Sequence, residues 1–433
     1  MSDKTDTPMR RAFSLANLGV GVAGSYLGYA LQSAFLDKPA RNAKLKATHK
    51  RAARRMADEM QTLRGAAMKL GQTLSLQTGT LPDETLAELA TLQMSAPPMH
   101  PSLVRAQFKQ SLGGEPEQIF KQFDPQPFAA ASLGQVHHAT TRAGEQVAVK
   151  IQYPGIRQSL VNDFKMFRTL SKPAQASGHL PKVAIDEVEQ QIISETDYQR
   201  EADNIDFFHE RLAPLRFVQV PKVLRKYSSD KVLTMSLMKG EHLDDFLARR
   251  PSQKLRNQLG ENLFELFYFQ VLEVQALHAD PHWGNYLFTK DARIALVDFG
   301  CAKYMSKATV SYLRRGFLFP GSTSSPEFSR LLEKYYEDEG RELPPATRKA
   351  LVRFAENFYR KVYPPNADQD KPFDFGDPQF LKDFLTASKE LFRAKGVLSE
   401  LIFMVRAEMG MYQTLHRLKA RVHTSRIVRK YLN

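Results

Sequence analysis

Two short acidic motifs in the second half of the chain place the strongest limit on its fold. The first runs from His278 to Asn285 and contains Asp280, and the second is Asp298-Phe299-Gly300, which follows an apolar strand pattern over 294–297. One carboxylate can orient or deprotonate a hydroxyl group or a water. An Asn carbonyl and a second carboxylate can hold Mg²⁺ on phosphates. We therefore assign Asp280 to catalysis, and Asn285 and Asp298 to a magnesium site.

The sequence upstream supplies a matching cation. Val147-Ala148-Val149-Lys150 is a buried-strand pattern that ends in Lys. Such a Lys suits the α- and β-phosphates of a nucleotide. A solvent-exposed Lys at a strand end is the alternative, but the order of the motifs favours the phosphate role. The acidic stretch 186–210 has helical periodicity, and Glu195 and Glu201 are both candidates for the carboxylate that holds Lys150.

An alanine-rich segment precedes that strand. It reads Phe128-Ala129-Ala130-Ala131-Ser132-Leu133-Gly134-Gln135-Val136. A glycine-rich nucleotide loop has the pattern Gly-x-Gly-x-x-Gly-x-Val, of which only the last Gly and the Val remain. Alanines stiffen such a loop and add Cβ atoms over the phosphates. An ordinary hairpin turn is the alternative. The predicted phosphate-side residues are Ala129, Ala130, Ala131, Ser132, Gly134, Val136 and Lys150.

In this order, the motifs resemble those of the UbiB family of atypical kinase-like proteins, also called AarF-domain kinases. That family adds a Lys-x-Gly-Gln motif, matched here by Lys69-Leu70-Gly71-Gln72, and a Glu-x-Asp motif, matched by Glu195-Thr196-Asp197. The resemblance covers residues 45–305. It implies that Glu201 pairs with Lys150 and that the other two carboxylates face the Lys69 motif. The implied gating residues are Lys69, Gly71, Gln72, Glu195 and Asp197.

The resemblance implies an α+β, bilobal protein-kinase-like fold with an N-terminal helical extension. Backbone groups at Met235 and Leu237 would bind adenine, although Ser236 stands where relatives often have an acidic residue. We expect four parts: a tail with a Gly-rich apolar segment (1–40), the helical extension (41–126), a small lobe (127–238) and a helical large lobe (239–433). We also expect a hairpin turn at 141–145, strands near 218 and at 232–235 that close the small lobe, and a buried helix over 255–277.

The net charge of +14 is unevenly distributed. Basic residues concentrate in 38–69 and in 416–433. Nucleic acid and an anionic membrane surface are the two candidate partners, and a solvated helix face is the alternative. Since the chain shows no nucleic-acid-binding motif, we expect no nucleic acid. The single cysteine, Cys301, excludes a disulfide framework.

The segment 13–35 favours a membrane. It has no Lys, Arg, Asp or Glu, and Gly24 and Gly28 have the spacing of helices that pack closely in lipid. Insertion or peripheral association is the preferred interpretation, a soluble docking helix the alternative, and homodimerisation through the segment is a further expectation. The expected location is the cytoplasmic face of a membrane, the inner membrane in a bacterium, with a soluble cytoplasmic protein as the alternative.

Three functions are compatible with these features. The first is an ATPase or small-molecule kinase of the UbiB type that uses Mg²⁺ and ATP, or ADP, in ubiquinone or other isoprenoid-lipid metabolism. Its partners would be a lipid or quinone precursor and other isoprenoid-lipid biosynthesis proteins. The second is a pseudokinase-like nucleotide-dependent scaffold, and the third is a true protein kinase. No long activation segment and no Ala-Pro-Glu follow Cys301, which disfavours the third.

Overall fold

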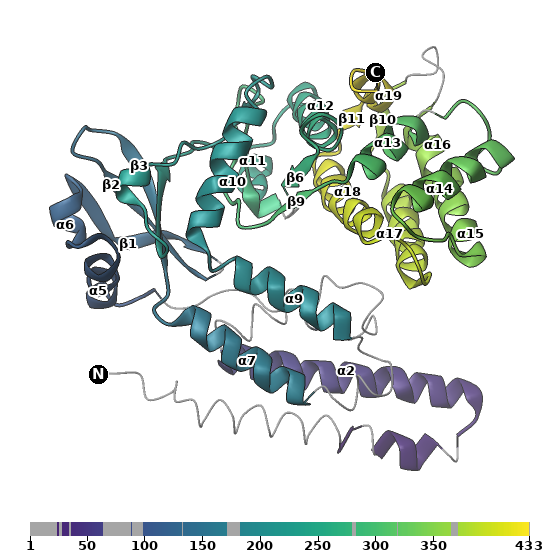
Figure 1. Cartoon of the computed structure of the whole chain (residues 1–433), viewed down its shortest axis with the longest axis horizontal. Coiled ribbons are helices and arrows are strands. Elements are labelled where there is room, and N and C mark those ends of the chain that lie inside the picture. The colour runs from purple at the N-terminus through teal and green to yellow at the C-terminus, as the bar shows by residue number, and fades with distance from the viewer. Residues whose placement is uncertain are drawn as a thin grey trace. The chain divides into compact units, whose positions relative to one another are not determined.

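The computed structural model describes residues 24–25, 28–33, 36–63, 88, 98–131, 133–170, 182–278, 283–317, 319–364 and 371–432. The chain forms two compact units, and each is described by itself (Figure 1). The first unit comprises residues 1–200 and 224–235, and the second comprises residues 201–223 and 236–433. The bounds of the four parts expected from the sequence stay predictions.

A four-stranded sheet forms the centre of the first unit. Its strand order is β1 (Gln122–Ala131), β2 (Gly134–Thr140), β3 (Gln146–Gln152) and β5 (Val232–Ser236). β1 pairs with β2, and β2 with β3, in antiparallel fashion. The turn expected at 141–145 is present, since Thr141 N donates to Glu145 O at 2.9 Å. Apolar side chains form the core beside the sheet: Val104, Phe108, Phe120, Val147, Val149, Ile151 and Val232.

Helices flank this sheet in the sequence. They are α2 (Lys38–Leu63), α5 (Pro101–Leu112), α6 (Pro116–Ile119), α7 (Ile156–Leu170) and α9 (Lys182–Ser194), and a short 3-10 helix, η1 (Arg225–Tyr227), precedes β5. Pro101 occupies the first turn of α5, as proline favours. The sheet begins at Gln122, so Pro127 lies inside β1 and does not mark the first strand residue. Lys69, Gly71 and Gln72 lie outside the described residues.

The helical periodicity of 186–210 is confirmed, but the stretch is not one unbroken helix. Two helices occupy this stretch, α9 and α10 (Tyr198–Arg211), and residues 195–197 separate them. The break is fixed by polar contacts, because Gln152 Nε2 donates to Thr196 O at 2.9 Å. Asp197 Oδ1 then accepts from Arg200 N at 3.1 Å, which caps the first turn of α10.

The second unit is largely helical. After α10, its α-helices are α11 (Leu243–Ala248), α12 (Gln253–Phe269), α13 (Lys307–Gly316), α14 (Pro326–Asp338), α15 (Pro345–Phe354), α16 (Arg360–Val362), α17 (Pro378–Arg393), α18 (Ser399–Leu418) and α19 (Thr424–Arg429). Two π-helical turns, η2 (Gln270–Val274) and η4 (Ala355–Tyr359), continue α12 and α15, and η3 (Trp283–Asn285) is a 3-10 turn. α18 packs against both α12 and α17 (Figure 1).

Short strands complete the second unit. β4 (Val218–Gln219), β8 (Ile294–Leu296) and β7 (Tyr286–Phe288) form one sheet, and β6 (Ala276–His278) pairs with β9 (Ala302–Tyr304). β10 (Phe373–Asp374) pairs with β11 (Arg421–Val422). The strand expected near 218 therefore does not close the small-lobe sheet, because it pairs in parallel with β8.

The helix expected over 255–277 is confirmed only in part. α12 is buried as predicted, and Leu259 and Phe264 are fully inaccessible to solvent. The helix ends at Phe269, however, and a π-helical turn follows. Gln275 then adopts a left-handed conformation with φ +56°, which turns the chain into β6. Leu277 consequently lies in a strand.

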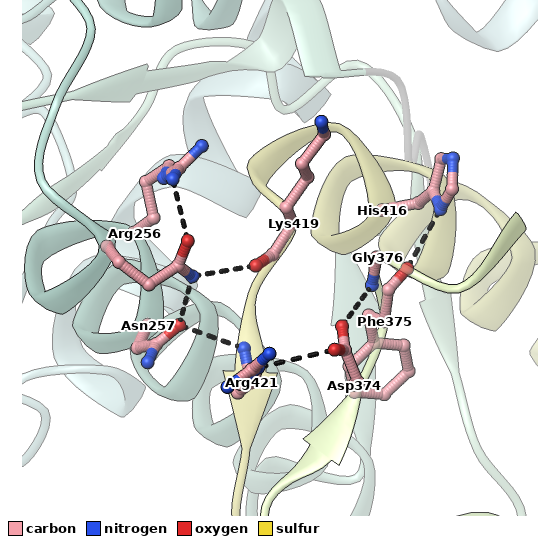
Figure 2. Close-up of polar contacts among 9 residues, drawn as sticks. Arg256, Asn257, Asp374, Phe375, Gly376, His416, Lys419 and Arg421 are labelled. Atoms are coloured by element: carbon pink, nitrogen blue, oxygen red, sulfur yellow. Dashed lines mark hydrogen bonds and ion pairs between the residues drawn. The ribbon is translucent and has the colours of Figure 1, made fainter.

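Polar contacts tie the C-terminal segment to α12 (Figure 2). Asn257 Oδ1 accepts from Arg421 N at 3.0 Å, and Arg421 Nε donates to Asp374 at 3.2 Å. Four basic side chains of the stretch 416–433 pair with acids of the same unit. The pairs are Arg417 with Asp244, Arg421 with Asp374, Arg426 with Glu261, and Lys430 with Glu265.

Among the described residues, no helix has the length and apolar character needed to cross a membrane. Of the Gly-rich segment 13–35, the structure describes residues 24–25 and 28–33, which are helical. The predicted insertion of this segment otherwise lies outside the described residues.

Candidate functional site

The alanine-rich segment forms a strand rather than an open loop. Ala129, Ala130 and Ala131 lie at the end of β1 and pair with Val136, Gln135 and Gly134 of β2. Ser132 lies outside the described residues. A Cβ atom added to Gly134 would lie 2.1 Å from Ile151 O on the neighbouring strand, so this position admits only glycine. The alanines thus lie on the first strand of a hairpin, and their predicted place beside the phosphates stays a prediction.

A hydrogen-bonded chain that the sequence did not predict holds this hairpin. Gln135 Oε1 accepts from Met99 N at 2.7 Å, so its amide nitrogen donates to His137 Nε2, also at 2.7 Å. His137 Nδ1 then donates to Asp124 O at 2.8 Å. Burial lowers the pKa of His137, which favours this neutral tautomer. Gln135 and His137 are two residues apart on one strand, so their side chains lie on the same face of the sheet. This spacing in the sequence could have indicated that the two side chains interact.

Lys150 occupies the predicted strand. It lies in β3 opposite Val136 and is 6% exposed. Its Nζ lies 5.2 Å from the ring centroid of Tyr198, the first residue of α10. A buried ammonium over an aromatic face retains its charge at less cost than in a purely aliphatic site. The predicted strand is thus confirmed, and the phosphate role of Lys150 stays a prediction.

Glu201 and the two acidic gating candidates lie on different parts of the helix–turn–helix. Glu195 and Asp197 belong to the turn between α9 and α10, in the first unit, whereas Glu201 lies one turn into α10 and belongs to the second unit. Glu201 is buried at 1% exposure. On the same helix, Asn204 Nδ2 donates to Phe299 O at 2.9 Å. Asn204 was missed by sequence reasoning, although it stands three residues after Glu201 on one helix face.

The second unit places Asn285 opposite Val297, the residue before Asp298, by a backbone hydrogen bond. Val297 N donates to Asn285 O at 3.2 Å, at the ends of the paired strands β7 and β8. Asp298 Oδ1 accepts from Gly300 N at 2.9 Å, and His278 Nε2 donates to Asp298 O. These two contacts fix the carboxylate and the backbone of the Asp-Phe-Gly turn. Asp280 lies outside the described residues.

The donor set suits Mg²⁺. Carboxylate and amide oxygens are ligands that Mg²⁺ accepts, and it usually takes only one or two protein ligands besides phosphate and water. Within the described ranges, no three His, Cys, Asp or Glu side chains cluster to bind a metal.

The hinge candidates border the end of β5. Met235 is buried at 5% exposure, and Leu237 is half-buried. Between them, Ser236 N donates to Lys222 O, and Ser236 Oγ accepts from Lys222 N, each at 2.9 Å. The serine that departs from the usual acidic residue thus has a structural partner of its own.

The segment after Asp-Phe-Gly is short, as expected. β9 begins at Ala302 and pairs with β6, and Ser306 already caps α13 by accepting from Thr309 N at 3.0 Å. Ser306 N also donates to Glu400 at 3.1 Å. Within the described stretch 283–317, the chain thus passes from the Asp-Phe-Gly turn to α13 without a long intervening loop.

Comparisons with known proteins agree with this organisation. A family model described as an ABC1 atypical kinase-like domain matches residues 91–319. The probable serine/threonine-protein kinase abkA of Dictyostelium discoideum is 28% identical, over 88% of this chain and 70% of its own. The mitochondrial atypical kinase COQ8 of Saccharomyces cerevisiae is also 28% identical, over 87% of this chain and 75% of its own.

A solved structure supports the fold. The complex of Rv3197 with erythromycin, from Mycobacterium tuberculosis, matches with a TM-score of 0.60 at 24% identity, and covers 91% of this chain and 98% of that chain. The α+β kinase-like fold predicted from the motifs is thereby confirmed. Because the family model spans just over half of the sequence, the chain belongs to the ABC1 atypical kinase-like family, the UbiB family that its motifs resemble.

Proposed function

We propose that the protein is an atypical kinase-like ATPase or small-molecule kinase that uses Mg-ATP. The observation that supports the proposal is the backbone hydrogen bond from Val297 N, in the residue before Asp298, to Asn285 O. An amide and a carboxylate at adjacent strand ends can share one Mg²⁺ on a triphosphate. The bound ion neutralises charge that builds up on the phosphates.

Each remaining candidate has a role in this proposal. Lys150 binds the α- and β-phosphates, and Glu201 is the carboxylate that orients it. Asp280 orients or deprotonates the acceptor. The alanine hairpin lies over the phosphates, and backbone groups at Met235 and Leu237 bind adenine. Lys69, Gly71 and Gln72, with Glu195 and Asp197, form the gate.

Two other functions are less well supported. A nucleotide-dependent scaffold would not require a buried strand lysine together with paired magnesium ligands. A protein kinase requires a surface that docks a peptide, whereas β9 leads within a few residues to the cap of α13. The retained lysine and magnesium candidates, together with the short segment between β9 and α13, favour transfer of phosphate to a small molecule or to water.

The pathway is inferred from the relatives. The yeast relative is named COQ8, an atypical kinase, and we propose ubiquinone or another isoprenoid lipid as the pathway that the protein supports. The substrate would be a lipid or a quinone precursor at the cytoplasmic face of a membrane. The basic helix α2 and the Gly-rich segment would provide the contact with anionic lipid, and the Gly-rich segment a route to a homodimer.

Substitution of Asp298 tests the proposal. We expect Asp298→Asn to abolish the Mg-dependent formation of ADP from ATP, because the neutral amide of Asn places no negative charge beside Mg²⁺. Turnover should be measured on the full chain with and without anionic liposomes and quinone precursors. Asp291→Asn is the matched control, since this exposed Asp lies in the turn between β7 and β8.

Retained turnover in Asp298→Asn, at a thermal stability equal to that of the wild type, would contradict the magnesium assignment. Equal losses in the Asp298 and Asp291 variants would attribute the effect to a disturbed β7–β8 hairpin. Loss in the Asp298 variant alone supports the proposal.

A further inference from the structure

A chain of buried hydroxyl groups in the second unit ends on a buried carboxyl group. We call Tyr268, Tyr363, Tyr412 and Glu408 the Glu408 network. Tyr268 comes from α12, Tyr363 follows α16, and the other two lie on α18. All four side chains are at most 1% exposed. None of them belongs to a motif of the proposed nucleotide site.

The hydrogen bonds of this network form one consistent path when Tyr268 donates to Glu408. Tyr268 donates its only hydroxyl proton to Glu408 Oε1 at 2.7 Å. Its contact with the Tyr363 hydroxyl must therefore be one in which Tyr363 donates. Tyr363 has then used its proton as well, so Tyr412 donates to Tyr363, at 2.8 Å. Three O–H groups thus point along one path toward Glu408.

The surroundings of Glu408 favour its neutral form. Glu408 Oε2 is buried and has no hydrogen-bond partner among the described residues. A negative charge there would be poorly solvated, and burial raises the pKa of Glu408 to about 8. The titratable groups that face it are Tyr268 of α12, Tyr359 of η4, Tyr363 after α16 and Tyr412 of α18. Within the described chain, no cation contributes to this pKa.

A neighbouring part of α18 supports the metal-site segment. Ala407 and Met411 line a small cavity of about 10 Å³, together with His278 and Tyr286. His278 is the side chain that donates to Asp298 O, and α18 also packs against η3, which contains Asn285. A shift of α18 would therefore be transmitted to both magnesium ligands, because packed interiors transmit displacement.

We infer that Glu408 is a positioning residue, whose hydrogen bond from Tyr268 latches α18 to α12 and so holds His278 and η3 in place for the reaction. The inference rests on the proposed Mg-ATP turnover for its kinetic consequence, but its structural part is independent of that activity. Protonated Glu408 keeps the latch closed. Ionised Glu408 leaves a charge buried away from water, and this desolvation outweighs the hydrogen bond from Tyr268 and favours separation of the two helices.

The test compares Glu408→Gln with the wild type over pH 6.5 to 9.5. The Gln amide oxygen can accept from Tyr268 as Oε1 does, but Gln does not titrate. We expect kcat of the wild type to fall above about pH 8, approaching tenfold per pH unit, with KM for Mg-ATP nearly constant. Glu408→Gln should match the wild type within about twofold at pH 7 and lack this fall. The same alkaline fall in both proteins would overturn the inference.

Tyr268→Phe separates the latch from general stability. It removes the donor to Glu408 and should lower kcat roughly five- to tenfold, whereas Tyr412→Phe removes only the far end of the chain and should have a smaller effect. An unchanged kcat in Tyr268→Phe would contradict the latch. Glu390→Gln, an exposed acid of α17, is the matched neutralisation control.

Hydrogen exchange decides the structural part even if the wild type shows no turnover. Amides of 283–288 should exchange faster above about pH 8 in the wild type, after correction for intrinsic exchange, and not in Glu408→Gln. Equal exchange in the two proteins would refute the latch. A difference in exchange without any turnover would support the latch and contradict the proposed function.

Discussion

Protonation of Glu408 should also set the stability of the second unit. Its pKa is raised from an ordinary 4.5 to about 8 in the folded state. Between these values the folded chain keeps a proton that the unfolded chain releases. The free energy of unfolding therefore falls as pH rises, by up to about 1.4 kcal/mol per pH unit, and levels off above the folded pKa.

Glu408→Gln should remove this dependence. The Gln side chain binds no titrating proton, so we expect the variant to be more stable than the wild type at pH 7, by about 3 kcal/mol. Urea unfolding at several pH values, followed by the fluorescence of Trp283, measures the difference, because this is the only Trp of the chain. A constant difference between the two proteins from pH 5 to pH 8 would show that Glu408 does not titrate in this range.

At the scale of elements, the β1–β2–β3 ladder depends on one glycine. A Cβ atom on Gly134 would meet Ile151 O at 2.1 Å, and backbone cannot move aside as a flexible side chain can. We expect Gly134→Ala to destabilise the first unit by about 3 kcal/mol or more, and to weaken nucleotide binding through the displaced hairpin. Thermal unfolding and nucleotide titration measure the two effects.

Gly316→Ala provides the matched control. Gly316 ends α13, and an added Cβ atom would lie 3.7 Å from the Tyr312 ring, which is ordinary contact. Alanine in a helix is favoured over glycine by up to about 1 kcal/mol, so this variant should be at least as stable as the wild type. A Gly134→Ala protein as stable as Gly316→Ala would mean that the ladder relaxes around the methyl group.

Local patterns predicted the elements that carry the magnesium and lysine candidates. The strand ending near Lys150 and the strand before Asp298 both follow from short apolar runs with no competing partner. The break before Tyr198 was not predictable, because residues 195–197 contain no Gly or Pro. It is fixed by the side chain of Gln152, from a strand more than forty residues upstream.

Pairing between segments that are far apart in the sequence explains the other features that were not predicted correctly. β4 pairs with β8, and α12 gives way to β6 because β9 provides a partner. Neither partner is visible in a local window of sequence. The Glu408 network was missed for the same reason, since tyrosines and an acid at wide spacing have no signature until α12, α16 and α18 pack together.

At the scale of the whole molecule, the two basic stretches of the sequence differ. In 416–433, Arg417, Arg421, Arg426 and Lys430 pair with acids of their own unit. On α2, by contrast, Ala52, Ala53 and Ala57 are buried, and basic side chains occupy the exposed positions. The exposed positions include Lys38, Arg41, Lys46, Lys50, Arg51, Arg54 and Arg55. α2 therefore presents a set of exposed basic side chains to an anionic partner.

The last prediction concerns binding of α2 to anionic vesicles. A basic residue near such a surface contributes about 1 kcal/mol, so replacing Lys46, Arg51 and Arg54 by Gln should weaken binding by about 3 kcal/mol, on the order of a hundredfold. Co-sedimentation with phosphatidylserine vesicles at 50 to 300 mM salt, values chosen to vary screening, measures the loss.

The matched control replaces Lys254, Lys361 and Lys382, three exposed lysines of the second unit, by Gln. Both triple variants change the net charge equally. If both weaken binding alike, net charge alone drives association and α2 is not the membrane contact. If only the α2 variant loses binding, and the wild type loses it as salt rises, the basic face of α2 is the surface that brings the protein to the membrane.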